Sequence, residues 1–244
     1  MKPKVFWLAL LLCAQAVTAM AAADGVTAGE VTLKIPAPSL LRYEVQGRVG
    51  FLPYRASGTL RWMHDGRTYA SELAVNVMLL GSRTQSSRGR ITPDGLQPQH
   101  FSDRVRDDRS VDFDYRDKLI RFSEGSAPSP LPAGAQDHLS VFMQLGSLIG
   151  SAPERYPAGT EITLPAMGIY GPETWRLLVR GEERLKLPGG ELTALRLTRP
   201  PSRPDDPSAE VWLAPSLGWL PARIRLTQGN HDFVDQMWLG SETP

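Results

Sequence analysis

The chain has a single cysteine among its 244 residues, and this residue, Cys13, lies in an apolar stretch near the N-terminus. Leu12 precedes it and the leader before it would be very short, so the sequence does not predict a lipid-modified cysteine. Once that N-terminal stretch is removed, the chain contains no thiol. Disulfides, thiolate catalysis and cysteine-ligated metal sites are therefore excluded for the mature chain.

The mature chain also has little net charge and no second long apolar run. The full chain has 27 Lys and Arg against 26 Asp and Glu, so removing Lys2 and Lys4 leaves 25 against 26, a net charge of −1. This balance provides no overall attraction to DNA, RNA or an anionic membrane surface. No other apolar run reaches the roughly 18 residues that cross a bilayer. We expect no nucleic-acid partner and no transmembrane segment in the mature chain.

Motifs for catalysis and nucleotide binding are missing as well. Residues 146–150 lack the spacing of a nucleophile elbow, and the chain has no phosphate loop or dinucleotide fingerprint. The four histidines, His64, His100, His138 and His231, form no motif with metal-ligand spacing. His138 is the best candidate for chemistry among them because it stands at the start of an expected helix. The sequence favours a non-enzymatic protein with no cofactor and no metal.

The N-terminus has the three parts of a secretory signal peptide. Two lysines are followed by an apolar run, residues 5–17, which is too short to span a bilayer, and then by small residues that suit signal peptidase. Any of three alanines can end the signal: Ala19, Ala21 or Ala23. We expect export to the periplasm, with a signal peptide over residues 1–23, a flexible leader over 24–36 and a single β-rich domain over 37–240.

Period-two alternation of apolar and polar residues dominates the rest of the chain. One face of residues 54–62 is predicted to hold Tyr54, Ala56, Gly58, Leu60 and Trp62. After a turn at residues 64–66, the alternation resumes over residues 69–79. Further strands follow at hairpin spacing with no helix-length crossover. We predict a mainly β fold, either one curved antiparallel sheet or an incomplete barrel.

One segment departs from this alternation and predicts a buried helix near residues 137–149. Asp137 suits the N-cap and Gly150 the position after the helix end, and no charge occurs between them beyond His138. Apolar residues cover nearly every side of this helix, so it must be buried. These apolar residues either complete the core, or they line or gate an apolar cavity. The candidates for lining or gating such a cavity are Leu139, Phe142, Met143, Leu145, Leu148 and Ile149.

Charged residues between positions 83 and 121 offer a weaker signal. Asp112 and Asp114 point to the same side of a predicted strand, where paired carboxylates can bind a cation or act as acid and base. Nearby arginines favour cross-strand ion pairs instead. The basic residues from Arg83 to Arg121 are interleaved with acids, so we expect them on a solvated face of the sheet, with binding of an anionic envelope polymer or a partner protein as the alternative.

Four phrases of the sequence resemble a family of exported bacterial proteins, the domain of unknown function numbered 3108. They are residues 41–45 (LRYEV), 91–98 (ITPDGLQP), 132–140 (PAGAQDHLS) and 219–224 (WLPARI). The resemblance covers most of residues 39–240. It implies export to the periplasm, a curved antiparallel sheet with little helix, and an architecture similar to lipoprotein-carrier proteins. It implies no activity.

Three functions remain open. The favoured one is a non-enzymatic periplasmic protein that binds an apolar or amphipathic envelope molecule, such as a lipid or acyl chain, in the curved sheet. The second is a cell-envelope assembly or protein-interaction factor with a solid core, and the third is a hydrolase with carboxylates on separate strands. A cavity under the helix would favour the first, an exposed apolar patch the second, and converging acids the third. The oligomeric state stays open.

Overall fold

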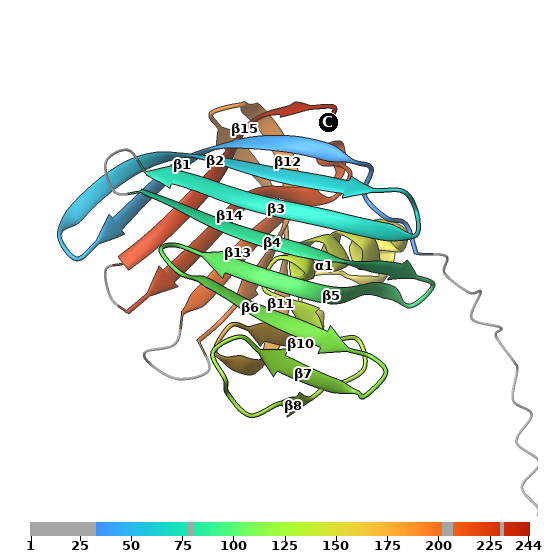
Figure 1. Cartoon of the computed structure of the whole chain (residues 1–244). Coiled ribbons are helices and arrows are strands. Elements are labelled where there is room, and N and C mark those ends of the chain that lie inside the picture. The colour runs from blue at the N-terminus through green and yellow to red at the C-terminus, as the bar shows by residue number, and fades with distance from the viewer. Residues whose placement is uncertain (1–32, 78–80, 202–206, 230–231) are drawn as a thin grey trace, which may run out of the picture. The chain divides into compact units, whose positions relative to one another are not determined.

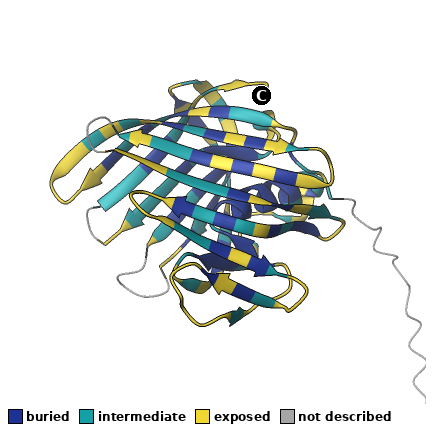
Figure 2. Ribbon diagram, in the orientation of Figure 1, coloured by how far each residue is buried: buried dark blue, intermediate teal, exposed yellow. Residues whose placement is uncertain are grey.

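Alternating apolar and polar side chains produce strands over most of the chain, which Figure 2 shows as bands of buried and exposed residues. The computed structural model describes residues 33–77, 81–201, 207–229 and 232–244, and the predicted signal peptide lies outside these ranges. The first eight strands are β1 (Ser39–Val49), β2 (Leu52–His64), β3 (Thr68–Val77), β4 (Gly81–Thr92), β5 (Gly95–Arg104), β6 (Asp108–Asp114), β7 (Leu119–Phe122) and β8 (Ser129–Pro130).

The second half of the chain contains the helix and seven further strands. A short strand, β9 (Gln136–Asp137), leads into helix α1 (Ser140–Ser151) and a single 3-10 turn, η1 (Pro153–Arg155). The remaining elements are β10 (Glu161–Gly168), β11 (Gly171–Leu187), β12 (Gly190–Arg199), β13 (Ser208–Ala214), the 3-10 turn η2 (Pro215–Leu217), β14 (Leu220–Gln228) and β15 (Asp232–Glu242).

All the strands belong to one curved sheet with the order β8-β7-β6-β5-β4-β3-β2-β1-β15-β14-β13-β12-β11-β10-β9 (Figure 1). Within the described ranges every pair is antiparallel except the two-residue contact of β9 with β10. The edge strands β8 and β9 do not pair, so the sheet stays open. This confirms the predicted fold class: mainly β, with a single curved antiparallel sheet and one buried helix.

The hairpin of β2 and β3 has the predicted pairing. Leu60 lies opposite Leu73 and Ala56 opposite Val77, so the apolar members of both strands share one face. The turn is fixed by Asp65, whose Oδ1 accepts hydrogen bonds from two backbone N–H groups two and three residues later, at 2.8 and 2.7 Å. The shared face lines the concave side of the sheet, where α1 lies (Figure 1).

Helix α1 begins at Ser140 and ends at Ser151, slightly later at both ends than predicted. Asp137 lies outside the helix but still serves as its cap, because its Oδ1 accepts the N–H groups of Leu139 at 2.9 Å and Ser140 at 2.7 Å. The predicted role of Gly150 is wrong, since the helix continues through this residue.

Gly146 and Gly150 allow a close contact between α1 and Trp219. A Cβ atom on Gly146 would lie 2.6 Å from the Trp219 carbonyl oxygen, and one on Gly150 would lie 2.7 Å from the indole Cδ1. Trp219 itself has a positive φ of 68°, a conformation that side chains other than glycine rarely adopt. The packing of the helix, and not the need to end it, therefore accounts for both glycines.

Residues 33–36, the end of the segment expected as a flexible leader, contact the helix end of the sheet. The Lys34 N–H donates to the Ser151 hydroxyl at 2.6 Å, and the Trp62 indole N–H donates to the Pro36 carbonyl at 2.8 Å. Pro36 is buried. This part of the chain therefore helps to cover the core beside α1.

Candidate functional site

The side chains predicted to line or gate a cavity lie in the packed core. Leu139, Met143, Leu145 and Ile149 are fully buried, Phe142 is 5% exposed and Leu148 is half-buried. The Phe142 ring meets the Trp175 ring edge-on, with centroids 6.0 Å apart. Neither of the two cavities described below is lined by a residue of α1. A role for these side chains in holding a ligand stays a prediction.

A group of polar side chains lies beyond Phe142 on the concave face. Trp175 Nε1 and Arg199 Nη2 both donate to Glu173 Oε2, at 3.1 and 2.9 Å. The Arg199 guanidinium also lies over the Trp175 ring, 4.8 Å from its centroid. His138 Nε2 lies 3.3 Å from Glu173 Oε1 without the alignment of a hydrogen bond. We call His138, Glu173, Trp175 and Arg199 the glutamate cluster.

The glutamate cluster lowers the pKa of Glu173 from 4.5 to about 2. Contact with the His138 imidazole is the largest cause, and the charges of His138 and Arg199 add to it against the effect of burial. A carboxylate with a lowered folded-state pKa stabilises the fold above its unfolded pKa. It loses this contribution as the pH falls through the folded-state value.

We therefore expect Glu173→Gln to be less stable than the wild type near neutral pH, and the difference to shrink between pH 4.5 and about 2. The free energy of unfolding in urea, measured at several pH values across this window, checks the expectation. The matched control is Glu182→Gln, which changes an exposed carboxylate on the same strand. If the difference in the free energy of unfolding between Glu173→Gln and wild type stayed constant down to pH 2, the glutamate cluster would not be what stabilises the ionised Glu173.

A second charged group faces the same concavity from β4 and β5. Arg83 Nε and Nη2 donate to the two carboxylate oxygens of Asp103 at 2.9 and 2.5 Å, and Gln85 Nε2 donates to Asp103 at 2.9 Å. Burial alone would raise the pKa of Asp103, but the hydrogen bonds and charge of Arg83 outweigh it and the pKa is lowered. Arg83 is thus not on the solvated outer face as expected; the register places it on the inner one.

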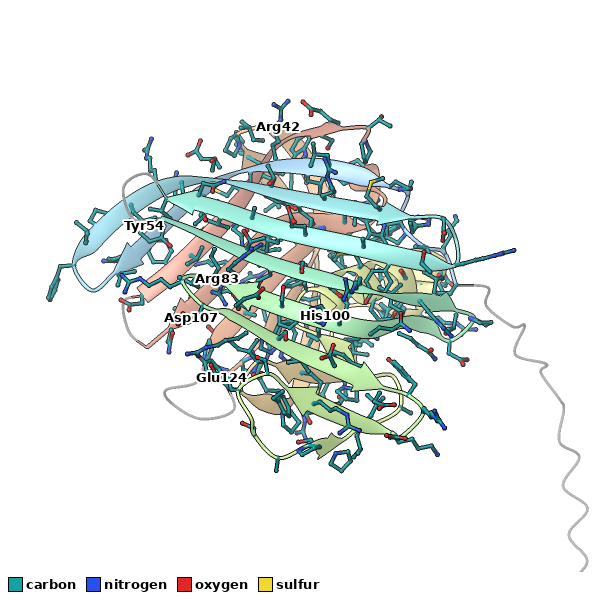
Figure 3. The ribbon with its side chains drawn as sticks, viewed as in Figure 1. Arg42, Tyr54, Arg83, His100, Asp107 and Glu124 are labelled. Atoms are coloured by element: carbon teal, nitrogen blue, oxygen red, sulfur yellow. The ribbon has the colours of Figure 1, made fainter. Side chains whose placement is uncertain are left out.

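A cavity of about 400 Å³ opens beside this ion pair, at the end of the strands away from α1. Its charged lining consists of Arg83, Asp103, Arg106, Asp107 and Arg109. Figure 3 shows Arg83 and Asp107 at this end of the sheet, with Tyr54 beside Arg83. Three guanidinium groups and two carboxylates line the cavity, and Glu124, outside the lining, pairs with Arg109 at 2.7 Å.

The turn between β10 and β11 closes one side of this cavity. Ile169 and Tyr170 line it, and the Tyr170 hydroxyl accepts a hydrogen bond from Arg109 Nη1 at 2.6 Å. The preceding Gly168 lies against His138, since a Cβ there would be 2.5 Å from the imidazole Cε1. The glutamate cluster and the cavity are therefore neighbours.

Apolar side chains between α1 and the open end of the concave face are only half-buried. They come from strands β2, β3, β14 and β15 and include Ala56, Val75, Leu226 and Val234. The register places them on the same face as the core residues Val45 and Leu73. The helix thus covers one end of the concave face, and the other end keeps apolar surface next to charged groups.

The paired carboxylates predicted on one strand lie on the outer face. Asp112 Oδ1 is 2.7 Å from His100 Nδ1, and Asp114 Oδ2 is 3.5 Å from Arg121 Nη2. They line a cavity of about 470 Å³. Each acid has a basic partner, as the alternative interpretation of this motif expected.

The other three histidines lie in different parts of the chain. His64 Nε2 lies 2.9 Å from the Pro36 carbonyl oxygen, His138 belongs to the glutamate cluster, and His231 lies outside the described residues. In the part of the chain that the structure describes, no three His, Cys, Asp or Glu side chains gather as metal ligands. No helix there combines the length and apolar character that a bilayer crossing takes.

Comparison with known proteins gives a family and little more. A family model described as "Protein of unknown function (DUF3108)" matches residues 42–231. No curated protein matches the sequence significantly. A crystal structure of a DUF1329 family protein from Desulfovibrio piger covers 85% of this chain and 86% of its own, with 12% identity and a TM-score of 0.32. At that TM-score the two backbones agree too loosely to inform function.

Proposed function

The chain belongs to the DUF3108 family, whose description assigns no function, and we propose that it is a non-enzymatic binding protein of the bacterial periplasm. Its ligand is an amphipathic envelope molecule, such as a lipid or acyl chain, held on the concave face of the open sheet. The observation that carries this proposal is that the helix covers only one end of the concave face. Helix α1 packs against one end, and half-buried apolar side chains continue toward the other.

The apolar part of the concave face suits an acyl chain. Ala56, Val75, Leu226 and Val234 lie on neighbouring strands of one continuous face, so an apolar chain laid along them would displace water from all four. Burial of apolar area is the general source of such affinity, and ligand pockets combine it with a few oriented polar groups.

The charged part of the concave face suits an anionic head group. Arg83, Arg106 and Arg109 line the cavity at the end of the apolar surface, and the Arg83 side chain remains 54% exposed although it pairs with Asp103. Guanidinium groups bind carboxylate and phosphate oxygens with two parallel hydrogen bonds. An anionic lipid matches both parts of the face.

The packed core around α1 gives some support to the second function, an assembly or interaction factor with a solid interior. The third function, a carboxylate hydrolase, has no comparable support. Asp137 has a raised pKa, but it is fully buried and its oxygens accept hydrogen bonds from Ser87, Leu139 and Ser140. Asp103 and Glu173, which also face inward, are both held by arginines, and the pKa of each is lowered. A general acid needs a raised pKa.

A fluorescent fatty acid tests the proposal with one inward and one outward substitution on β3. Val75→Asp puts a charge in the apolar surface, directly opposite the head-group residue Arg83 on β4, and we expect it to weaken probe binding by about tenfold or more. Asn76→Asp adds the same charge to the exposed outer face and should leave binding unchanged. The dissociation constant is measured by fluorescence titration, and thermal melts verify that both variants are folded.

Two outcomes of this titration would count against binding on the concave face. One is a wild-type protein that binds no fatty acid. The other is equal binding by wild type and a folded Val75→Asp variant, which would place the probe elsewhere on the molecule. The first outcome would leave the interaction factor as the better description.

A further inference from the structure

The tip of the hairpin between β1 and β2 exposes an unusual run of apolar residues. Every residue from Arg48 to Pro53 is exposed. Phe51 is 99% exposed, and Val49 and Leu52 are each 62% exposed. Three large apolar side chains on one tight turn cannot be buried against the chain's own fold, and exposed apolar clusters of this kind mark contact surfaces.

Two other turns at the same end of the sheet repeat this feature. Val105, between β5 and β6, is 62% exposed, and Tyr170, between β10 and β11, is 81% exposed. Both residues line the cavity beside Arg83. The three turns with these strongly exposed apolar side chains lie at the end of the sheet away from α1 (Figure 1). The less exposed Met63, Tyr115 and Leu239, at 36–48%, lie elsewhere.

Basic residues accompany these apolar tips. Arg48 and Arg55 flank the β1–β2 tip, both are exposed, and no acidic residue lies between them. One carboxylate is close by, because Asp232 Oδ1 accepts the Gly50 N–H at 2.7 Å. The β5–β6 turn, residues 104–109, has three arginines and two aspartates, and its Arg109 pairs with Glu124 at 2.7 Å. The excess of arginine therefore lies at the β1–β2 tip itself.

A side chain from the same hairpin connects the tip with the cavity. The Tyr54 ring lies directly over Gly47 of the opposite strand, which only the missing side chain of that glycine allows. Tyr54 lies beside Arg83 in Figure 3, and Arg83 lines the cavity. The tip, Tyr54 and the proposed head-group region thus follow one another along the concave side.

We infer that the β1–β2 tip, residues 48–55, docks on a bilayer surface that contains anionic phospholipid. Phe51 and Leu52 enter the region between head groups and acyl chains, and Arg48 and Arg55 contact the phosphates. This places the open end of the concave face against the membrane. The inference rests on the proposed function in one respect only, the identity of the amphipathic molecule that would pass between the membrane and the concave face.

The test is co-sedimentation with vesicles of phosphatidylcholine containing phosphatidylglycerol. The protein is purified after expression of the full chain, and mass spectrometry establishes that all variants share one N-terminus. We expect Phe51→Ser/Leu52→Ser to lower the vesicle partition coefficient by at least about tenfold. The matched control is Leu239→Ser, which removes another exposed leucine, 48% exposed, on β15 away from the tip.

Raising the salt concentration from about 0.05 to 0.5 M should weaken wild-type partitioning severalfold, since the arginine contacts are exposed. Equal partitioning of wild type and Phe51→Ser/Leu52→Ser would overturn the inference. So would a wild type that stays off the vesicles, including one in which the tip instead drives self-association in analytical ultracentrifugation.

The fatty-acid titration separates this inference from the proposed function. Phe51→Ser/Leu52→Ser should bind the fluorescent fatty acid as the wild type does, and Val75→Asp should partition onto vesicles as the wild type does. Loss of fatty-acid binding in the tip variant would overturn the separate docking role of the tip. Failure of the wild type to bind the fatty acid, with vesicle partitioning intact, would overturn the proposed function alone.

Discussion

Leu145→Asp is expected to leave no folded protein at neutral pH. Leu145 is fully buried on α1, in a core that neither cavity reaches. An aspartate there would have to be buried with its charge unpaired or stay protonated, and either costs several kcal/mol. Domains of this size are stable by only about 5–15 kcal/mol, so one such change is comparable with the whole stability. Circular dichroism and a thermal melt of the purified variant measure the loss.

Two milder changes on the same helix serve as controls. Leu148 is half-buried, so Leu148→Asp should give a folded protein with a reduced melting temperature. Phe142→Ala removes a buried ring that packs edge-on against Trp175 and should cost about 3–5 kcal/mol. A Leu145→Asp variant that melts like the wild type would mean that α1 borders a wet cavity and not a packed core.

Asp137→Ala is the second change for which we expect a large effect. The Asp137 carboxylate is fully buried and accepts hydrogen bonds from the Ser87 hydroxyl at 2.6 Å and from the N–H groups of Leu139 and Ser140. Alanine leaves the two N–H donors buried without a partner, at a cost of about 1–3 kcal/mol each before relaxation, and leaves the Ser87 hydroxyl only its hydrogen bond with the Tyr69 hydroxyl at 3.0 Å. We expect a loss of at least about 3 kcal/mol in the free energy of unfolding, measured in urea.

Asp137→Asn is the matched control because its Oδ1 can still accept the N–H groups of Leu139 and Ser140, while its NH2 group replaces Oδ2 and can donate to the Ser87 hydroxyl. Burial raises the pKa of Asp137 although all its hydrogen bonds lower it. The charge itself is thus costly here, and the value of the side chain lies in its accepting oxygens. We expect the asparagine variant to lose less than half of what alanine loses. Equal losses would show that the charge, and not the cap geometry, stabilises the start of α1.

Much of the fold could be predicted from local sequence patterns. The alternation over residues 54–62 fixes which side chains share a face, and the structure pairs that face with β3 in the predicted manner. The lack of charge around Leu145 similarly predicts that α1 is buried on most sides. Both properties depend on residues that are close in sequence, which is why a single sequence contains them.

The glutamate cluster could not be predicted in this way. Its members come from the segment before α1 and from strands β11 and β12, so 35 positions separate His138 from Glu173 and 26 separate Glu173 from Arg199. The pairing of β9 with β10, of β10 with β11 and of β11 with β12 brings them together. His138 was the best histidine candidate, but nothing in the sequence named its partners.

The inward position of Arg83 is indicated by the sequence, but the neighbouring residues favour the opposite interpretation. It shares strand parity with Gln85 and Ser87, whereas Arg88 and Arg90 have the opposite parity, so it faces the other side of β4. The interleaved acids nearby made a solvated face the simpler interpretation for the whole run. The exposure of Phe51 at the β1–β2 tip could not be predicted from the sequence, because the exposure of a side chain depends on the tertiary structure around it.

The central claim, that the concave face holds an amphipathic molecule, is tested most directly by native mass spectrometry of the protein isolated gently from bacterial envelopes. We expect the wild type and Asn76→Asp to carry an added mass that fragments to an anionic lipid or fatty acid, and Val75→Asp to have the mass of the polypeptide alone. A wild type that shows only the polypeptide mass, even after incubation with extracted envelope lipids, would contradict the claim.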